Sequence, residues 1–311
     1  MDPHSEPSAS TSRSGISING ISKRYRRLTA VKDLKLEVKE GEVFGFLGLN
    51  GAGKTTTIRI LLDLLRPSAG RASIMGLDCQ SQGLEVRSSV GYLPGEMGLY
   101  RDMTGRELLD FLGRLGTRPV VESYREQLVK RLELSAAELK RKLREYSTGM
   151  KRKLGLIQAF QSDPPLLILD EPTEGLDPLM QESFYELLSE AKARGRTVFM
   201  SSHVLSEVGR VCDRIGLLRK GELVLLSTVE DVRALAPRRL RVWFDRDVNR
   251  PGDFPAKYEI VEIQPRLWSL RVHGPLGWLT EHLSGLPVLD IEIDEPRLED
   301  VLTRYYREES Q

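Results

Sequence analysis

Short apolar runs alternate with amphipathic stretches along much of this chain, as in proteins whose strands alternate with helices. Apolar and polar residues alternate over Ala30–Val38, and isoleucines recur within Ile16–Ile21, which predicts two strands with one buried face each. Val43–Leu47 and Leu166–Leu169 are continuous apolar runs, of the kind found in strands covered on both faces. These two runs therefore predict central strands of a sheet.

Stretches with the apolar spacing of helices lie between these runs. A helix is expected to follow Val43–Leu47 after a glycine-rich segment, to carry Ile58 and Leu65 on one face, and to end at Pro67. We also expect helices from Thr148 onward and at residues 181–194 and 205–212, strands at residues 197–201 and 215–219, and a mostly helical insertion at about residues 95–145. Strands and helices in this order predict a mostly parallel α/β sheet.

The pattern changes after Ser227, where short alternating runs are separated by loops rich in Pro and Gly. We expect strands at residues 240–244, 258–263, 267–272 and 288–293, and helices at residues 277–283 and 298–307. This predicts a small α+β domain at residues 227–311, after a larger domain at residues 15–226. Residues 1–14 are rich in Ser and Pro, which predicts a disordered tail.

Composition narrows the class of protein. The 311 residues include 46 Lys and Arg against 45 Asp and Glu, so no basic surplus favours a nucleic-acid partner. The basic runs at residues 140–142 and 151–153 are interpreted as solvated helix faces. The longest uncharged stretch, Val43–Gly53, is shorter than the roughly 20 apolar residues of a membrane span. The two cysteines lie far apart, which favours a reducing compartment, and we expect a soluble cytosolic protein.

The glycine-rich segment after the first buried run has the pattern of a phosphate-binding loop. Gly48, Gly53, Lys54 and Thr55 match Gly-x-x-x-x-Gly-Lys-Thr between a predicted strand and a predicted helix. In such a loop the main-chain N–H groups point at phosphate oxygens, and the helix N-terminus adds its positive dipole end. We expect Lys54 to contact the β- and γ-phosphates and Thr55 to bind Mg²⁺. The whole predicted nucleotide-binding segment is Gly48, Leu49, Asn50, Gly51, Ala52, Gly53, Lys54, Thr55 and Thr56.

Two acidic residues end the second buried run. Asp170 and Glu171 follow Leu166–Leu169 at the carboxyl end of a strand, where open α/β sheets bind ligands. Such a pair is in many proteins only a solvated strand end. Together with a phosphate-binding loop, it indicates a carboxylate that binds Mg²⁺, Asp170, and a general base that activates water, Glu171.

These motifs resemble those of the ATP-binding subunit of an ABC transporter, and the resemblance extends over about Gly15–Leu226. Tyr146-Ser-Thr-Gly-Met150 is similar to the family's signature Leu-Ser-Gly-Gly-Gln, in the form found in subunits that pair with ABC-2 type permeases. Gly175-Leu-Asp177 resembles the D-loop, and Ser201-Ser-His203 resembles the switch-histidine loop. The resemblance implies a P-loop NTPase fold of ABC ATPase type, with a parallel core sheet, an antiparallel β subdomain and a helical subdomain.

The resemblance also assigns roles to single residues. His203 would contact the γ-phosphate and act in catalysis with Lys54 and Glu171, although a histidine after a buried strand can also be a structural residue. Asp177 would belong to the D-loop. The signature residues would bind the ATP that a second subunit holds; they are Ser147, Thr148 and Gly149.

Two positions match the family less directly. Tyr25 matches the aromatic residue that stacks on adenine, but among the neighbouring charges it could equally pack on the surface. The Q-loop glutamine is expected directly after Val90-Gly-Tyr-Leu-Pro94, where this chain has Gly95. A glycine offers no side-chain oxygen to Mg²⁺ or water, and Glu96 is the nearest residue that could supply one.

Cofactors, partners and location follow from the resemblance. It implies ATP and Mg²⁺ as cofactors, and a head-to-tail homodimer of nucleotide-binding domains. It also implies a separate ABC-2 type transmembrane permease that contacts the helical insertion, which places the chain at the cytoplasmic face of the cell membrane. Such pairs are typically exporters of drugs, antibiotics, lipids or polysaccharides.

Three other classes of protein share part of these motifs. A soluble ABC-type ATPase that acts on a non-membrane partner is the main alternative. A GTPase-like switch would need an Asn-Lys-x-Asp motif, which the sequence lacks. A nucleotide-binding module that does not hydrolyse ATP is disfavoured by the presence of Lys54, Asp170, Glu171 and His203.

Overall fold

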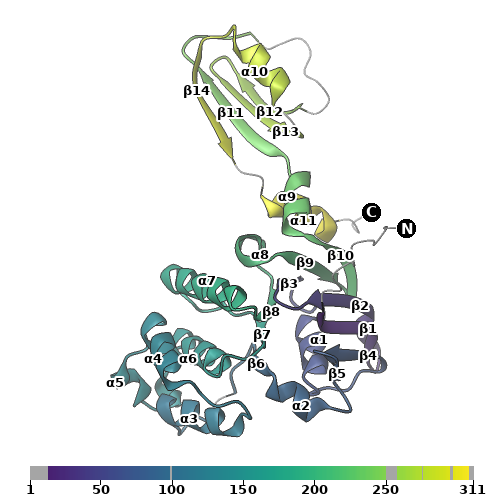
Figure 1. Ribbon diagram of the computed structural model, residues 1–311. Coiled ribbons are helices and arrows are strands. Elements are labelled where there is room, and N and C mark those ends of the chain that lie inside the picture. The colour runs from purple at the N-terminus through teal and green to yellow at the C-terminus, as the bar shows by residue number, and fades with distance from the viewer. Residues whose placement is uncertain (1–12, 99, 250–257, 275, 295–296, 308–311) are drawn as a thin grey trace, which may run out of the picture. The chain divides into compact units, whose positions relative to one another are not determined.

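The computed structural model describes residues 13–98, 100–249, 258–274, 276–294 and 297–307 (Figure 1). The chain divides into two compact units, Met1–Leu226 and Ser227–Gln311. This division coincides with the change of sequence pattern after Ser227. Residues 1–12 of the expected tail lie outside the described residues, whereas Ser14 already belongs to the first strand.

A six-stranded sheet forms the centre of the first unit, in the order β10-β9-β3-β8-β7-β6. Its middle is parallel, and every residue of β3 (Val43–Leu47), β7 (Leu166–Asp170) and β8 (Thr197–Ser202) is buried. β6 (Val90–Leu93) extends this parallel order beyond β7, and β9 (Arg214–Arg219) extends it beyond β3. The continuous apolar runs are therefore central strands, as the sequence predicts.

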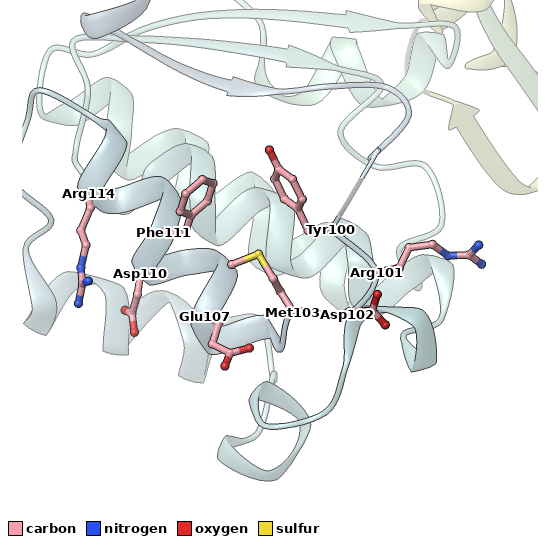
Figure 2. A pocket seen from close by; sticks show the side chains of 8 residues that line it. All are labelled: Tyr100, Arg101, Asp102, Met103, Glu107, Asp110, Phe111 and Arg114. Atoms are coloured by element: carbon pink, nitrogen blue, oxygen red, sulfur yellow. The ribbon is translucent and has the colours of Figure 1, made fainter.

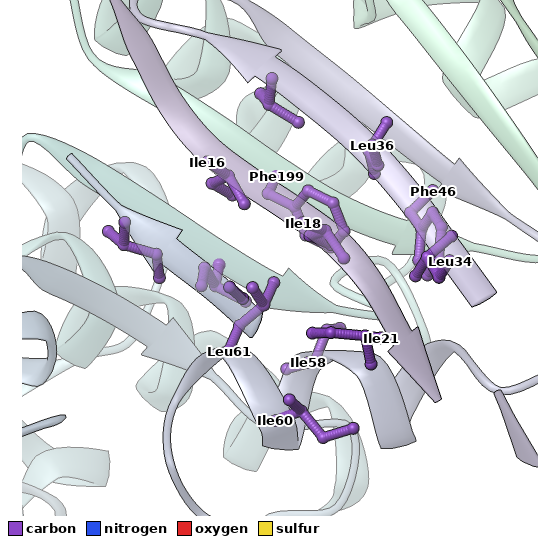
Figure 3. Close-up of a cluster of buried hydrophobic side chains, with 14 of the residues drawn as sticks. Ile16, Ile18, Ile21, Leu34, Leu36, Phe46, Ile58, Ile60, Leu61 and Phe199 are labelled. Atoms are coloured by element: carbon purple, nitrogen blue, oxygen red, sulfur yellow. The ribbon is translucent and has the colours of Figure 1, made fainter. Parts of the chain in front are cut away.

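An antiparallel sheet in the order β2-β1-β4-β5 completes the core of this unit. Its strands are β1 (Ser14–Tyr25), β2 (Leu28–Lys39), β4 (Ala69–Ile74) and β5 (Leu77–Asp78). The buried isoleucines of β1 and the leucines of β2 pack with Ile58 and Leu61 of α1 (Lys54–Leu61) and with Phe46 and Phe199 of the parallel sheet (Figure 3). Burial of this apolar cluster fixes β3 and α1 relative to each other, and so fixes the loop between them.

Helices of the insertion gather beside β6 and β7 (Figure 1). The insertion contains α3 (Gly105–Leu115), α4 (Glu122–Arg131), α5 (Ala136–Leu139) and a 3₁₀ turn at Leu143–Glu145. Capping boxes start α3 at Thr104 and α5 at Ser135, because each of these side chains accepts the N–H of a glutamate three residues later. The unit is completed by α2 (Gly83–Ser88), α6 (Thr148–Phe160), α7 (Pro178–Ala193) and α8 (Leu205–Val211).

The structure corrects some of the expected elements. α1 ends at Leu61 rather than at Pro67, because Asp63 adopts a left-handed φ of 54° and the N–H groups of Leu64 and Leu65 both turn back to the carbonyl of Arg59. The sequence pattern also did not predict β4, β5, β6, α2, or β10 (Glu222–Thr228). These elements are short and largely half-buried, so they carry little periodic signal.

The second unit is a four-stranded antiparallel sheet with helices. Its order is β12-β13-β11-β14, with β11 (Arg238–Phe244), β12 (Tyr258–Gln264), β13 (Leu267–Val272) and β14 (Val288–Asp294). Trp268 is fully buried and contacts Phe244 edge-on, with ring centroids 4.7 Å apart. Both rings belong to the hydrophobic core of this unit, to which α10 (Gly277–Leu283) also contributes. Two further helices contact each other, α9 (Val229–Leu235), which was not expected, and α11 (Leu298–Arg307).

One edge of this second sheet is apolar and acidic. β14 is paired on one side only, with β11, among the strands that the structure describes. Leu289, Ile291 and Ile293 of β14 are 67%, 43% and 50% exposed, and Asp290 and Glu292 lie between them. The register pairs Ile291 with Val242 of β11, which is buried, so the apolar side chains of β14 continue the core face of the sheet into solvent.

Candidate functional site

The carboxyl ends of four neighbouring parallel strands bring the sequence motifs together. In the order β3-β8-β7-β6, these ends are followed by Gly48, His203, Glu171 and Pro94. The register pairs Leu47 with Ser202, Asp170 with Ser201, and Leu93 with Leu169, so the strands end at nearly the same level. Motifs far apart in the chain therefore meet at one edge of the sheet, where open α/β folds bind ligands.

The loop between β3 and α1 has the backbone geometry of a phosphate-binding loop. Gly51 and Gly53 adopt φ values of 82° and 110°, a region that residues with a side chain rarely enter. A Cβ at Gly53 would also lie 2.4 Å from the carbonyl oxygen of Ala30. Only glycine fits this position, which is the N-cap of α1, so the loop can turn its N–H groups towards the helix N-terminus.

Lys54 lies inside this loop and faces the end of β7. The residue is 5% exposed, and Nζ donates to the carbonyl of Gly48 and lies 3.1 Å from Oε1 of Glu171. The ammonium group is thus held between the loop and the acidic strand end. This places a fixed positive charge where the phosphates of a nucleotide would lie.

Asp170 is completely buried and held by two hydroxyl groups. Thr55 Oγ1 donates to Oδ2 at 2.9 Å, and Ser201 Oγ donates to Oδ1 at 2.5 Å. Ser201 also accepts the N–H of Glu171 at 3.0 Å. These bonds fix the carboxylate of Asp170 beside Thr55, as expected for two ligands of one cation.

Glu171 adopts a left-handed φ of 51° directly after β7. Such a conformation is costly for a residue with a side chain and persists where the surroundings enforce it. Its Oε2 lies 2.8 Å from Nδ1 of His203 and accepts the N–H of His203 at 3.3 Å. Glu171 therefore contacts both Lys54 and His203, and the three predicted catalytic residues form one group.

A cavity of about 570 Å³ opens beside this group. Its lining includes Asn50, Thr55, Thr148 and Asp170, together with Gly95 and Glu96. A Cβ at Gly95 would lie 3.2 Å from Oδ2 of Asp170, so position 95 is adjacent to the predicted cation ligands although it carries no side chain. Glu96 is exposed at the rim. Tyr92 also lines the cavity, and burial, with the charge of Asp170 second, raises the pKa of its phenol to about 12.

The donor atoms at this site suit Mg²⁺. A hydroxyl and a carboxylate lie side by side, and Mg²⁺ in nucleotide sites is commonly bound through one or two such protein oxygens, with phosphates and water completing its shell. The described residues contain no group of three or more His, Cys, Asp and Glu that could hold a metal without such help. Thr55 and Asp170 therefore fit a cation that arrives with a nucleotide.

Other predicted site residues lie apart from this group. Ser147 caps α6 by accepting the N–H of Met150 at 3.2 Å, and Ser147 and Thr148 are exposed at the helix N-terminus. Asp177 caps α7 by accepting the N–H of Met180 at 3.0 Å. Tyr25 is 44% exposed, with Nζ of Lys23 5.2 Å from its ring centroid. Of these residues, Thr148 lines the cavity beside Asn50 and Thr55, and the nucleotide contacts of all of them stay predictions.

The sequence analysis missed three residues of the site. Ser201 was noted only as part of a loop motif. Arg152 was interpreted as part of a solvated basic face, which is wrong, because it is 5% exposed and donates to main-chain carbonyls of the site. Glu207 is buried against the hydroxyl groups of Thr173 and Ser202, and burial raises the pKa of its carboxyl group. The sequence shows that Arg152 and Glu207 are charged, but it does not show that they are buried. Without their burial, nothing distinguishes them from charged residues on the surface.

Comparisons with known proteins agree with this geometry. A family model described as ABC transporter matches residues 31–174. An uncharacterized ABC transporter ATP-binding protein of Synechocystis is 33% identical over 300 residues, which are 93% of this chain and 83% of the relative. A Nod factor export ATP-binding protein of Neorhizobium galegae is 38% identical over 227 residues, which are 70% of this chain and 64% of the relative.

Solved structures have the same fold. A structure described as the ATP-binding subunit of an ABC transporter superposes with a TM-score of 0.65 at 32% identity, and the match covers 70% of this chain and 91% of that chain. In the described part of the present chain, no helix is both long and apolar enough to cross a membrane.

Proposed function

The chain belongs to the ABC transporter ATP-binding family, and from this premise we propose that it powers export through a separate permease of ABC-2 type. Its fold is that of an ABC ATPase cassette, and it is an ATPase. The observation that carries the proposal is the convergence of Lys54, Glu171 and His203, with Asp170 and Thr55 beside them.

Each residue of this group has a role in ATP hydrolysis. The phosphate-binding loop and Lys54 would hold the β- and γ-phosphates, and Glu171 would accept the proton of the attacking water. His203 would contact the γ-phosphate and orient Glu171 through the bond at Nδ1. When bound by Thr55 and Asp170, Mg²⁺ would neutralise phosphate charge. Phosphoryl transfer needs mainly positioning and charge stabilisation, which this rigid group of side chains supplies.

The signature segment supports a head-to-tail homodimer. Ser147 and Thr148 are exposed at the N-terminus of α6, a 13-residue helix, and half-buried Gly149 follows them. A helix N-terminus attracts anions through its free N–H groups and its dipole. We assign this end of α6 to the γ-phosphate of an ATP held by a second copy of the chain, so that ATP would lie between the two copies.

One relative supports export, and the form of the signature supports the ABC-2 type of permease. One relative is named for Nod factor export, and the Tyr-Ser-Thr-Gly-Met form of the signature resembles subunits of ABC-2 systems. The cargo class would be a drug, an antibiotic, a lipid or a polysaccharide. We place the working protein at the cytoplasmic face of the membrane, where its permease holds it.

A groove on the insertion is the surface that we assign to the permease (Figure 2). The groove has a volume of about 700 Å³ and lies along α3 and the segment before it. Tyr100 and Phe111 are 60% and 37% exposed and meet edge-on, with ring centroids 5.7 Å apart. Figure 2 shows both rings on one side and the carboxylates of Glu107 and Asp110 on the other. Gly95, which lines the nucleotide cavity, and Tyr100, which lines the groove, are only five residues apart in the sequence.

Capture of the partner from membranes tests this proposal. Tagged full-length chain is purified in mild detergent from membranes of its native host, and a stoichiometric multi-pass membrane protein is expected to co-purify. Phe111→Ala should reduce this capture without changing basal ATPase activity. Leu115→Ala, a change on the same helix but outside the groove lining, is the matched control. Purification of the chain alone, or with ribosomes, would contradict the transport role and leave the ATPase chemistry in place.

A further inference from the structure

The guanidinium group of Arg152 joins segments of the site that are far apart in the chain. Arg152 lies in the second turn of α6 and is 5% exposed. Nη1 donates to the carbonyl of Pro94 at 3.0 Å, and Nη2 donates to the carbonyl of Gly95 at 2.8 Å. Nε donates to the carbonyl of Glu174 at 3.1 Å. The side chain therefore binds the main chain on both sides of the cavity.

These contacts enclose the turn that carries the general base. Besides the carbonyl of Glu174, Nη1 lies 3.5 Å from the carbonyl of Asp170, so Arg152 contacts both ends of the turn from Asp170 to Glu174. Glu171, inside this turn, has the left-handed φ of 51°. A conformation of this kind needs support from its surroundings, and the guanidinium group provides it at both ends.

Burial of this charge has a cost that argues for a specific role. Burial lowers the pKa of the guanidinium group, and the carboxylates of Glu174, Asp170 and Glu171 act in the opposite direction. Arginine stays protonated at any pH at which proteins work, so a full charge is buried here. A buried charge without well-placed acceptors is strongly destabilising, and these planar donors are matched by main-chain carbonyls and, at 3.4 Å, by the carboxylate of Glu174.

Because position 95 is a glycine, the hydrogen bond from Arg152 to its carbonyl matters more for holding the loop after β6. Gly95 has no side chain with which to contact Asp170 or a ligand, so the loop after β6 is joined to the strand end through its main chain. Arg152 makes this connection, and it lies five residues after Ser147 on α6.

We propose that Arg152 is a positioning residue for ATP hydrolysis, which holds the Glu171 turn and the Gly95 loop together and connects both to the signature helix. In this role Arg152, which lines the nucleotide cavity, acts through Glu171. The inference rests on the proposed role of Glu171 as general base. It assigns to the interior of α6 a function separate from the anion-binding N-terminus of that helix.

Substitution of Arg152 in the full chain tests the inference. Arg152→Lys keeps the charge but loses the planar set of donors, so we expect kcat to fall about tenfold or more. KM and the affinity for a fluorescent ATP analogue should change by less than about threefold. Lys153→Met, which removes a neighbouring charge outside the cavity lining, is the control and should keep the wild-type kcat. Thermal unfolding of both variants shows whether the fold is retained.

Chemical rescue separates positioning from a merely structural role. Millimolar guanidinium ion should raise the kcat of Arg152→Ala several-fold and leave wild type and Lys153→Met unchanged. A kcat of Arg152→Lys within twofold of wild type would overturn the inference. So would a parallel loss of kcat and nucleotide affinity in both Arg152 variants without rescue, because that result indicates general disruption. Glu171→Gln is measured alongside: if it keeps its turnover, the general-base role and this inference both fail, whereas an inactive Glu171→Gln together with a wild-type kcat in Arg152→Lys overturns this inference alone.

Discussion

Ser201→Ala is the substitution whose effect can be worked out most directly from the structure. Ser201 is completely buried, and Oγ donates to Oδ1 of Asp170 while accepting the N–H of Glu171. A hydrogen bond to a charged group contributes about 1.5–3 kcal/mol, and a neutral one about 0.5–1.5 kcal/mol. Alanine leaves both partners without this oxygen, so we expect the first unit to lose about 2–4 kcal/mol of unfolding free energy.

The positions of the tryptophans allow the two units to be followed separately. All three tryptophans, Trp243, Trp268 and Trp278, lie in the second unit, so their fluorescence reports on that unit alone. Urea unfolding followed by circular dichroism should show the first-unit transition of Ser201→Ala at lower urea, while the fluorescence transition stays in place. Ser189→Ala, which removes an exposed hydroxyl on α7, is the control. A loss below about 0.5 kcal/mol for Ser201→Ala would refute the reasoning, because that is the usual range of surface substitutions.

Three further predictions concern the same site. Glu171→Gln should lower the single-turnover rate of ATP hydrolysis by about 100-fold or more while ATP binding is kept, and wild-type turnover would contradict the general-base assignment. Burial raises the pKa of Glu207, so its contribution to stability is full below the unfolded-state value of about 4.5 and is lost as pH rises through the raised folded-state pKa. As pH rises from 5 to 8, the free energy of unfolding of Glu207→Gln should therefore increase relative to that of wild type. Equal urea midpoints for the two proteins throughout that range would refute this. Gly53→Ala should destabilise the chain and weaken ATP binding, because its Cβ meets the carbonyl of Ala30, whereas Gly195→Ala, at a φ of 73° with open space around it, should cost only about 1 kcal/mol. Equal losses for the two glycines would contradict the steric argument.

The sequence predicts those parts of the site that depend on local chemistry. A phosphate-binding loop needs glycines, a lysine and a threonine in one short segment, and a strand end marks Asp170 and Glu171 in the same way. The long apolar strands are predictable for a similar reason, because burial on both faces leaves a continuous apolar run. The fold class therefore followed from the sequence, and the residues that it predicts for the site lie close together in the structure.

Residues whose role depends on distant partners were not predictable from local pattern. Arg152 stands between two lysines in a basic run, and only its burial against Pro94 and Gly95 distinguishes it from a solvated charge. Ser201 becomes informative only when β8 is placed beside β7, since that pairing brings it to Asp170. Short strands such as β5, two residues long, carry too few positions for any period to appear.

The edge strand β14 of the second sheet affects the tendency of the chain to aggregate at high concentration. In the part of the sheet that the structure describes, β14 is an edge strand with three exposed apolar side chains, a combination that favours pairing of identical strands and aggregation. If two β14 strands met in antiparallel register around Ile291, Asp290 of one chain would lie opposite Glu292 of the other, twice. Like charges directly opposite each other destabilise a strand pair. We therefore expect that replacement of Asp290 and Glu292 by Asn and Gln, which also removes the ion pair of Glu292 with Arg241, lowers the concentration at which the chain precipitates.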